Sequence, residues 1–232
     1  WSERHRYRAE LTDLDAAIAL AKQVGDTPDK KPVLLADVAD NPGAGGRGNT
    51  PYILRGLYEA DVRNAVVGMV IDPPLAIAAK EAGVGATITA VFNSAETTEF
   101  SEKFQADVTV EKIFEGPCVG RRGLFANRRI DLGICALLSM NGIQVIVATQ
   151  RHQLADPIFI ERMGIDIGDI KVLAVKSRGH FRAGFDEYFP HEQIIEVDAP
   201  GLTTPILTRL GLDRVPRPTY PLDPDMTWHS SD

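Results

Sequence analysis

Apolar positions in the first part of the chain follow two periods, and these periods alternate. Helical spacing begins at Leu11, whereas a short continuous run such as Val33–Ala36 is typical of a strand buried on both faces. Thr50 and Pro51 stand where an N-cap and a first-turn proline would open the next helix. The expected elements are a helix over 11–25, a strand over 33–36, a helix over 51–60, a strand over 66–71, a helix over 72–82 and a strand over 86–92. This alternation predicts a parallel sheet with crossover helices.

The pattern becomes β-rich over residues 107–149. Asn141-Gly142 separates two apolar runs, and this dipeptide favours a hairpin because both turn positions need positive φ. The strands expected here cover 108–114, 119–125, 132–140 and 143–148. We therefore expect an antiparallel insertion or meander.

Helices and strands alternate again after residue 149. The expected elements are a helix over 155–163, a strand over 172–175, a helix over 180–188 and a strand over 194–197, followed by a proline-rich stretch that should be extended and irregular. The predicted fold class is α/β, with a mostly parallel sheet, crossover helices and the β-rich antiparallel insertion. We expect one domain over residues 1–232.

The charge balance restricts the partners. The chain has 25 lysines and arginines against 32 aspartates and glutamates, and this net charge of −7 disfavours nucleic acid and anionic lipid. The basic cluster at 121–129 has few interleaved aromatic residues, which favours a solvated ribbon edge. Residues 130–149 reach the length of a membrane span, but the Asn-Gly turn in their middle favours two strands. We expect neither a nucleic-acid nor a membrane partner.

The start of the chain carries polar and cationic residues rather than a targeting segment. Cys118 and Cys135 are too few for a disulfide framework or a four-cysteine metal site, so a cytoplasmic location is the default expectation. Because the first residue is Trp1 rather than methionine, we expect the sequence to begin inside a longer protein.

Polar side chains follow five of the predicted strands. Ligands bind beyond the carboxyl ends of parallel strands, where loops and helix N-termini converge. Strand ends generally meet polar loops, but here short polar side chains occur together with glycine, which lets a ligand approach the backbone. The residues at these ends are Asp37, Asp40, Asn41, Asp72, Thr149, Gln150, Arg151, His152, Lys176, Ser177, Asp198, Ala199, Pro200 and Gly201.

A glycine-rich loop over 40–50 joins a predicted strand to a predicted helix. Bare backbone N–H groups at a helix N-terminus suit phosphate or carboxylate. The Lys-Ser/Thr pair of a P-loop is missing, and the glycines at 43, 45, 46 and 48 fit G-x-G-x-x-G poorly. An anion site and a plain turn are the alternatives.

The segment from Lys176 to Arg182 is the second candidate for chemistry. A helix that began near Arg178 would point His180 and Lys176 toward the strand-end face. His180 could then act as a general acid or base, or stabilise an oxyanion. The alternative is a structural histidine that caps its own helix or bonds a neighbouring carbonyl.

Metal ligation and cysteine chemistry have weak support within this chain. The histidines are His5, His152, His180, His191 and His229, and they form no H-E-x-x-H motif or close His/Asp pair on one helix face. Cys118 has no recognisable histidine partner for nucleophilic catalysis. We expect no metal site in this chain.

Several segments resemble one family. The stretch PVLLADVADNPGAGGRGNT, the later VVGMVIDPPLAIAAKEAGVGATITA, and then VKSRGHFRAGF, VDAPGLTTP and RPTYPLDPD are similar, in the same order, to the C-terminal domain of microcystinase C (MlrC-like) proteins. The resemblance runs from about residue 12 to 225. It implies a zinc metallopeptidase whose larger N-terminal domain precedes this one and holds the zinc ligands.

The resemblance also implies site residues, position by position. Asp40, Asn41, Pro42, Gly43, Gly45 and Gly48 match the D-N-P-G-x-G loop of the family, and Lys176, Ser177, His180, Phe181 and Arg182 match its K-S-x-x-H-F-R-A segment. Where the family usually has Pro-Gly-Asp, this chain has Arg47-Gly48-Asn49. The missing carboxylate puts an acid/base role at Asn49 in doubt, although its amide could still cap the next helix.

The leading interpretation is therefore the C-terminal domain of an MlrC-like zinc hydrolase acting on peptide or related amide bonds. Zinc in the N-terminal partner domain would activate water and polarise the scissile carbonyl. Here His180 is the catalytic candidate, and the substrate-binding candidates are Asp40, Asn41, Gly43, Gly45, Gly48, Lys176, Ser177 and Arg182. The alternative is a non-catalytic module that binds a small carboxylate or phosphate, or an assembly domain that forms a homo-oligomer through the β-rich insertion.

Overall fold

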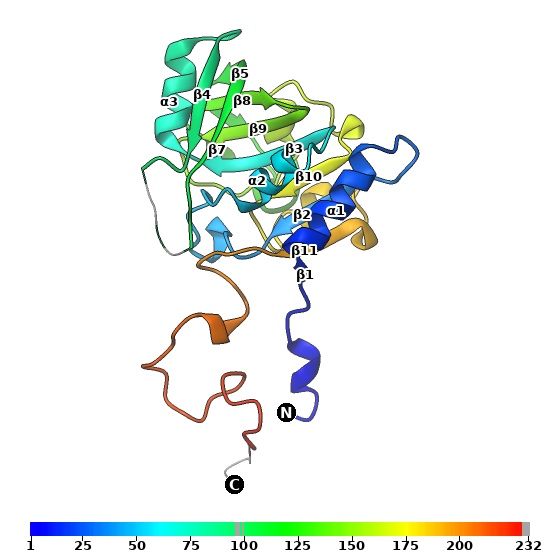
Figure 1. Cartoon of the computed structure of the whole chain (residues 1–232), viewed down its shortest axis with the longest axis vertical. Helices are drawn as coiled ribbons and strands as arrows, with labels where there is room; N and C mark the ends of the chain where they lie inside the picture. The colour runs from blue at the N-terminus through cyan, green and yellow to red at the C-terminus, as the bar shows by residue number, and fades with distance from the viewer. Residues whose placement is uncertain (96–97, 99, 229–232) are drawn as a thin grey trace.

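The chain folds around a nine-stranded mixed sheet, seen in a computed structural model that describes residues 1–95, 98 and 100–228. The strand order is β1-β11-β2-β10-β3-β9-β8-β5-β4 (Figure 1). The strands are β1 (Thr12–Asp13), β2 (Val33–Asp37), β3 (Ala65–Ile71), β4 (Thr87–Phe92), β5 (Phe104–Phe114), β6 (Pro117–Val119), β7 (Arg129–Asp131), β8 (Cys135–Met140), β9 (Ile143–Ala148), β10 (Val172–Val175) and β11 (Ile194–Asp198). The helices are α1 (Leu14–Gly25), α2 (Tyr52–Glu59), α3 (Pro73–Ala82), α4 (Ile158–Glu161) and α5 (Arg182–Phe185).

Six strands, from β1 to β9 in the sheet order, run parallel. β10 lies between β2 and β3, with Val172 aligned to Val33 on one side and to Ala65 on the other. Every residue of β2, β3 and β10 is buried, as expected for strands covered on both faces. The α/β fold class predicted from the sequence is confirmed.

The other end of the sheet is antiparallel. β8, β5 and β4 follow β9, each antiparallel to its neighbour. The prediction that residues 86–92 continue the parallel set is wrong, because β4 pairs with β5 at the sheet edge and runs opposite to β3. Its exposed residues Thr87 and Thr89 mark a strand with a solvated side, which antiparallel sheets tolerate.

The predicted hairpin at Asn141-Gly142 is confirmed. β8 pairs with β9 from Met140 and Ile143 outward, and the two turn residues have φ of 46° and 78°. β9 also pairs in parallel with β3, so this hairpin connects the antiparallel and parallel parts of the sheet. In the described part of the chain, no helix has the length and apolar character needed to cross a membrane.

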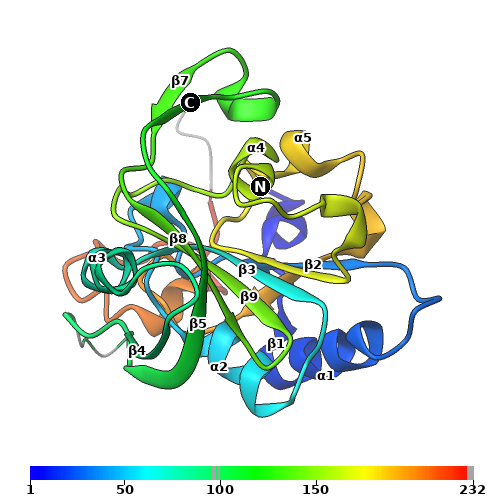
Figure 2. The same cartoon turned by 90° about the horizontal axis from the view of Figure 1, so that it is seen from above.

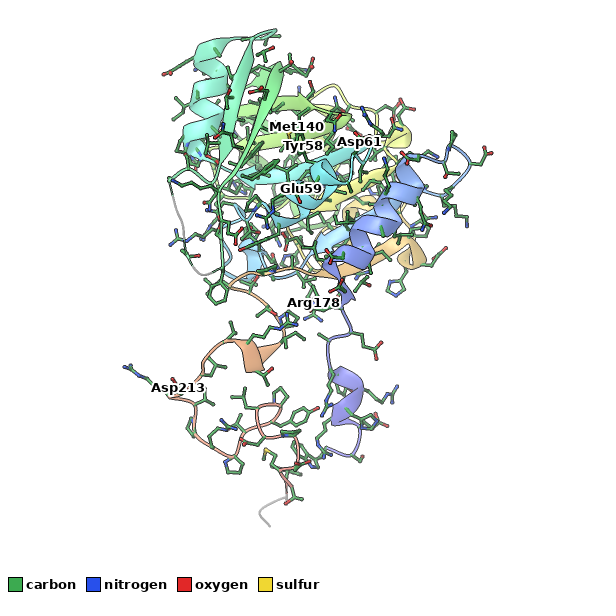
Figure 3. All side chains as sticks on the ribbon, in the orientation of Figure 1. Tyr58, Glu59, Asp61, Met140, Arg178 and Asp213 are labelled. Carbon is green, nitrogen blue, oxygen red and sulfur yellow. The ribbon has the colours of Figure 1, made fainter. Side chains whose placement is uncertain are left out.

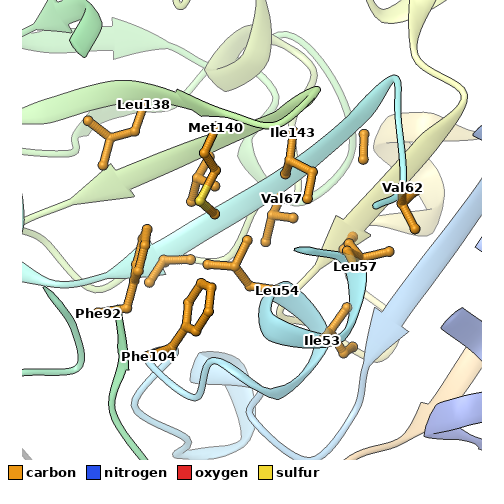
Figure 4. Packing of buried hydrophobic residues seen from close by; sticks show 14 of the residues in the cluster. Ile53, Leu54, Leu57, Val62, Val67, Phe92, Phe104, Leu138, Met140 and Ile143 are labelled. Carbon is orange, nitrogen blue, oxygen red and sulfur yellow. The ribbon is translucent and has the colours of Figure 1, made fainter. Parts of the chain in front are cut away.

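Helices cover both faces of the sheet (Figure 2). α1, α2 and α3 pack on one face, where Leu54 and Leu57 of α2 lie near Val67 and Ile143 of the sheet (Figure 4). The segment with α4 and α5 covers the other face, and Phe159, Phe181, Phe185 and Phe189 are fully buried there. The sheet therefore separates two apolar cores.

Several elements are shorter than predicted. The helix expected over 155–163 is α4, because the Asp156 carboxylate accepts the N–H groups of Arg121 and Arg122 and keeps the preceding residues outside the helix. The helix expected over 180–188 is α5, preceded and followed by turns. The strand expected over 119–125 ends at Val119, and a 3-10 turn occupies Gly123–Phe125.

The two ends of the chain extend together from one edge of the sheet (Figure 1). Tyr220 joins them: its hydroxyl donates to the carbonyl of Arg4 at 3.2 Å and accepts from Arg8 Nε at 3.2 Å. Its ring meets the ring of Trp1 edge-on, with 5.5 Å between centroids. The proline-rich stretch is irregular as predicted, but it lies against the N-terminal residues. Arg178 lies where these ends meet the body of the protein (Figure 3).

Candidate functional site

The glycine-rich loop between β2 and α2 is fixed by one buried carboxylate. Asp40 accepts the N–H groups of Gly48 and Thr50, both at 2.7 Å, and the Thr50 hydroxyl at 2.9 Å. Thr50 is therefore not the N-cap of the next helix, as the sequence had suggested: Pro51 takes that position, without a side-chain cap. Nor does Asn49 cap it, since its amide donates to Asn93.

The N–H groups of this loop already have acceptors. Gly43 donates to the side chain of Asn41 at 2.9 Å, and Gly46 donates to the carbonyl of Asn41 at the same distance. Gly45 donates to Pro42, and Gly48 donates to Asp40. The expectation that these glycines present bare anion-binding donors is wrong, because the loop satisfies them internally.

Lys176 is buried beneath the loop. Its Nζ donates to Asp37 Oδ2 at 3.0 Å and Asp40 Oδ2 at 2.9 Å, and it also reaches the carbonyl of Thr50 at 2.6 Å. Its side chain is 5% exposed, and the two carboxylates are each 3% exposed. A buried cation needs such partners, so Lys176 and Asp40 hold β2, β10 and the loop in one arrangement.

The two carboxylates differ in character. Burial raises the pKa of Asp37, and the attraction of Lys176 does not cancel that effect. Burial acts on Asp40 in the same direction, but Lys176 and the N–H groups of Thr50 and Gly48 outweigh it and lower the pKa of Asp40. Burial likewise opposes the charge of Lys176, yet the two carboxylates raise its pKa. Asp40 is thus the carboxylate whose charge the fold favours.

Gln153 connects the two predicted segments. Its Nε2 donates to Asn41 Oδ1 in the loop and to Ser177 Oγ, 3.0 Å away, after β10. Its Oε1 lies 2.7 Å from Nδ1 of His180. The convergence of the loop, Ser177 and His180 at one edge of the sheet is therefore confirmed.

This arrangement selects a tautomer of His180. Two acceptors, Asn41 Oδ1 and Ser177 Oγ, lie beside the Nε2 atom of Gln153. The Oε1 atom of Gln153 therefore faces the imidazole and accepts a hydrogen bond from His180 Nδ1–H. The Nε2 atom of a neutral imidazole then carries the lone pair. His180 is exposed, so that lone pair is available to a substrate or water at the edge of the sheet.

Gly43 makes the approach of Gln153 to the loop possible. A Cβ at this position would lie 2.6–2.7 Å from three atoms of the Gln153 amide, a distance too short for packed atoms. The absence of a side chain at residue 43 therefore serves a close contact rather than a turn.

Arg182 is held outside this cluster. Its guanidinium donates to Glu196 at 3.0 Å and lies 3.1 Å from Nδ1 of His191. Arg178 also pairs with Glu196. The structure thus brings the glycine-rich loop, Lys176, Ser177 and His180 together, while Arg182 is ion-paired with Glu196 of β11.

A second polar group lies on the β3 side of the loop. Asn49 donates to Asn93 Oδ1 at 2.9 Å, and Asn93 donates through its backbone to Asp72 at 2.7 Å and through its side chain to Ser101 at 2.6 Å. Burial raises the pKa of Asp72, which also accepts the N–H of Leu75 at the start of α3. Asn49, Asp72 and Asn93 are among the residues that line a hollow of about 280 Å³.

Sequence reasoning missed Gln153 and Asn93. Gln153 lies five residues beyond the end of β9, in a stretch where Gln150, Arg151 and His152 drew attention instead. Asn93 directly follows β4, and that strand had been assigned to the parallel set. The signal was a polar side chain after a strand, but only pairing in the sheet shows which strand ends are adjacent.

No group of three or more histidine, cysteine, aspartate and glutamate side chains within residues 1–95, 98 and 100–228 could hold a metal ion. His229 lies outside the described residues. Both cysteines are buried, and burial raises the pKa of Cys135 to about 12. The thiol of Cys118 is likewise made less acidic by burial, which raises its pKa.

A mostly parallel sheet with a glycine-rich loop and polar side chains gathered at its carboxyl edge defines an α/β domain, a class of domain in which ligands generally bind at that edge. A family model described as the MlrC C-terminus matches residues 35–214, which is most of the chain. The chain therefore belongs to that family, and the resemblance seen in the sequence is confirmed.

Two longer proteins are similar to this chain. Microcystinase C from Sphingomonas sp. is 27% identical over 156 residues, which cover 67% of this chain and 30% of the relative. A crystal structure of a "Putative metallopeptidase" from Mesorhizobium sp. BNC1 matches with a TM-score of 0.81 and 26% identity, over 99% of this chain and 44% of that one. This chain thus spans less than half the length of either relative. The family description places the matched region at the C-terminus of its members.

Proposed function

We propose that this chain is the C-terminal domain of an MlrC-like zinc-dependent hydrolase that cleaves peptide or related amide bonds at a site shared with an N-terminal partner domain. Membership of the MlrC C-terminus family supports the hydrolase class. The names of the Sphingomonas and Mesorhizobium relatives support the choice of a metal-dependent peptidase. The observation that carries the proposal is the hydrogen bond that His180 Nδ1–H donates to Gln153 Oε1, at the edge where the polar side chains gather.

The zinc belongs to the partner domain in this proposal. The described residues of this chain do not fit a zinc centre, because no three of their ligating side chains lie together. No step assigned to this chain passes through the metal. Its contribution is a wall of the site, which supplies a proton-transfer group and a shaped loop.

His180 is the group proposed to move a proton. With Nδ1–H held by Gln153, its Nε2 can accept a proton from the attacking group or donate one to the leaving amine. Asn41 and Ser177 are positioning residues, since they fix Gln153. Asn41 and Ser177 thus hold Gln153 in place, and Gln153 in turn holds the imidazole of His180.

The remaining candidates receive roles that follow from their contacts. Asp40 and Lys176 hold the loop from below, which supports positioning rather than direct contact with substrate. Gly45 and Gly48 have positive φ, and Gly45 is exposed with nothing within 4 Å of a Cβ, so substrate backbone could approach there. Arg182 has its own anionic partner, Glu196, and substrate would have to compete with it.

His180→Ala, made in the protein that carries both domains, tests the proposal. We expect turnover of a peptide substrate to fall by roughly tenfold to a thousandfold, the range for a lost acid/base or oxyanion group. Bound zinc should stay the same. His5→Ala, which changes an exposed histidine in the N-terminal stretch outside the Gln153 network, is the matched control.

Two results would contradict the proposal. Loss of zinc with the His180 side chain would make His180 a ligand that crosses the domain boundary. Unchanged turnover and zinc content with a lower melting temperature would make it a structural residue.

A further inference from the structure

The strand β4 forms one edge of the nine-stranded sheet, at the periphery of the molecule (Figure 2). On its inner side it pairs with β5, with Thr87 aligned to Thr109 and Phe92 to Phe104. At the opposite end of the sheet, the edge strand β1 has two residues and carries the charge of Asp13, and both features limit pairing with another chain. β4 has six residues, so it is the longer of the two edges.

The sequence of β4 lacks the features that protect an exposed edge. Residues 87–92 read TITAVF, so the strand has no charged side chain and no proline. Its pairing with β5 is continuous from Thr87 to Phe92, without a bulge. Charges, prolines and bulges are the usual protection of an edge, and an uncharged run rich in β-branched and aromatic residues is typical of segments that pair with other strands. The outer edge of β4 is therefore suited to receive a further strand.

The hydrogen bonds to β5 determine which backbone groups of β4 face outward. The N–H of Val110 on β5 donates to the carbonyl of Ala86 at 2.9 Å. In an antiparallel pair, every second residue bonds to the neighbouring strand, and the residues between them point away from it. The residues that bond to β5 are therefore Ile88, Ala90 and Phe92. The residues whose N–H and C=O groups face the outer edge are Thr87, Thr89 and Val91. Among the described residues, no loop donates to or accepts from these three positions.

A second copy of the chain fits this edge because β4 is complementary to itself. When two copies of β4 lie antiparallel about a two-fold axis, outward-facing residues must pair with outward-facing residues. An axis at Thr89 meets this condition, since it places Thr89 opposite Thr89 of the second copy and Thr87 opposite Val91. No like charges then meet along the strand, and threonine pairs are favourable across strands.

The charges at the two ends of β4 are also complementary in this arrangement. Glu81 lies near the start of β4, at the end of α3, and Lys103 lies beside the end of β4, directly before β5; both are exposed. Their neighbours already form ion pairs, which are Lys80–Glu115 and Glu102–Arg55. The two-fold axis brings the Lys103 end of each copy to the Glu81 end of the other. Unlike charges thus face each other at both ends of the paired strands.

We propose that this chain forms a two-fold symmetric dimer in which β4 pairs antiparallel with β4 of a second copy, with Thr89 opposite Thr89. The two sheets become one continuous sheet, and each copy covers the exposed edge of the other. Because the same surface is used on both copies, assembly at this edge stops at the dimer. This surface lies outside the β-rich insertion over 107–149, which the sequence had suggested for assembly. The dimer does not depend on the proposed hydrolase activity.

The oligomeric state of the purified chain tests the proposal. Sedimentation at micromolar concentration should show a dimer. Thr89→Lys places two like charges opposite each other at the axis, and we expect the dissociation constant of the dimer to rise by at least about tenfold. Gln105→Lys is the matched control, because it adds the same charge at an exposed position of β5, one strand away from the edge, and it should leave the dimer intact. A monomeric chain, or an equal effect of the two variants, would overturn the proposal.

A cross-link tests the register without an added charge. Thr89→Cys brings two thiols together at the axis, where the paired Cα atoms would lie about 5.5 Å apart, a separation that a disulfide spans. Oxidation by dissolved oxygen should convert most of this variant into a covalent dimer on a non-reducing gel, whereas Gln105→Cys should remain uncrosslinked. The native Cys118 and Cys135 are buried and should not contribute. A covalent dimer from both variants, or from neither, would contradict the pairing of Thr89 with itself.

Discussion

Asp37 and Asp40 share one buried lysine, yet the fold treats their charges differently. The Asp40 carboxylate accepts two backbone N–H groups and a hydroxyl in addition to Lys176, whereas Asp37 accepts Lys176 and one backbone N–H at 3.3 Å. Hydrogen bonds to the charged form favour ionisation, and burial opposes it. The number of donors therefore decides which carboxylate stabilises the folded chain.

Asp40→Asn should be more destabilising than Asp37→Asn. We expect a loss of about 3 kcal/mol for Asp40→Asn at pH 7, since one partner of a buried ion pair is removed, and a smaller loss for Asp37→Asn. Chemical denaturation of both variants, followed over pH, measures the difference.

The two carboxylates should also contribute to stability in opposite pH ranges. The pKa of Asp40 is below its ordinary value of 3.8, so its contribution to stability is complete above pH 3.8 and is lost as the pH falls through the lower folded pKa. The pKa of Asp37 is above 3.8, so its contribution is present below that pH and is lost as the pH rises through the folded pKa. Equal losses with the same pH trend would show that the two carboxylates are equivalent.

Substitutions at Gly43 and Gly45 distinguish the loss of a side-chain contact from backbone strain. In Gly43→Ala the new Cβ would displace Gln153, and we expect turnover of the two-domain protein to fall by about tenfold because His180 loses its orientation. In Gly45→Ala the Cβ has open space, but φ is 102°, so the cost of about 1 kcal/mol falls on stability. Steady-state kinetics and melting curves distinguish the two, and equal turnover would remove Gln153 from the mechanism.

Among the elements, the β8–β9 hairpin depends most on its turn residues. Gly142→Ala should destabilise the chain by about 1–2 kcal/mol, because residue 142 has φ of 78° and a Cβ would meet the side chain of Arg63. Gly179→Ala, where nothing lies within 4 Å of a Cβ and no positive φ is found, should change stability by less than about 0.5 kcal/mol. Urea denaturation of both variants is the measurement, and equal losses would contradict the assignment.

The sequence predicted elements well where local chemistry is decisive. The buried strands β2 and β10 are continuous apolar runs, and the Asn141-Gly142 turn needs no distant partner. The direction of β4 depends on its pairing with β5, which follows it in the chain. The alternation of helices and strands does not show that pairing, so β4 was wrongly assigned to the parallel set. The lengths of α4 and α5 were overestimated. For α4, helical spacing gives no information on the hydrogen bonds that Asp156 accepts from the N–H groups of Arg121 and Arg122, which lie between β6 and β7.

The candidate site was predictable only in part, for the same reason. Residues at strand ends are visible in the sequence, and Asn41, Ser177 and His180 were found in that way. Gln153 joins them through three side-chain contacts that link residues far apart in the chain. Conversely, the sequence pattern could not show that the buried carboxylates of Asp37 and Asp40 neutralise Lys176. Nor could it show that Arg182 is paired with Glu196.

For the whole molecule, the two extended ends form a unit that is separate from the sheet (Figure 1). Tyr220→Ala removes the ring contact with Trp1 and the bonds to Arg4 and Arg8. We expect faster tryptic cleavage after Arg214 and an unchanged melting temperature of the body, because the buried cores contain no residue of these ends.

Limited proteolysis with a matched control checks this expectation. Tyr7→Ala removes a tyrosine that is 84% exposed in the N-terminal stretch, and it should leave the cleavage rate as it was. A lower melting temperature in Tyr220→Ala would show instead that the ends stabilise the sheet.

The position of β10 has a consequence for how the chain reaches its folded state during synthesis. β2 and β3 leave the ribosome long before β10, which must later insert between them and pair with both. Until then each of the two earlier strands presents an unpaired edge, the kind of surface that associates with other chains. Lys176 follows β10 directly, so Asp37 and Asp40 also wait for their counter-charge. A nascent chain of this protein should therefore need protection from aggregation until residue 176 has emerged.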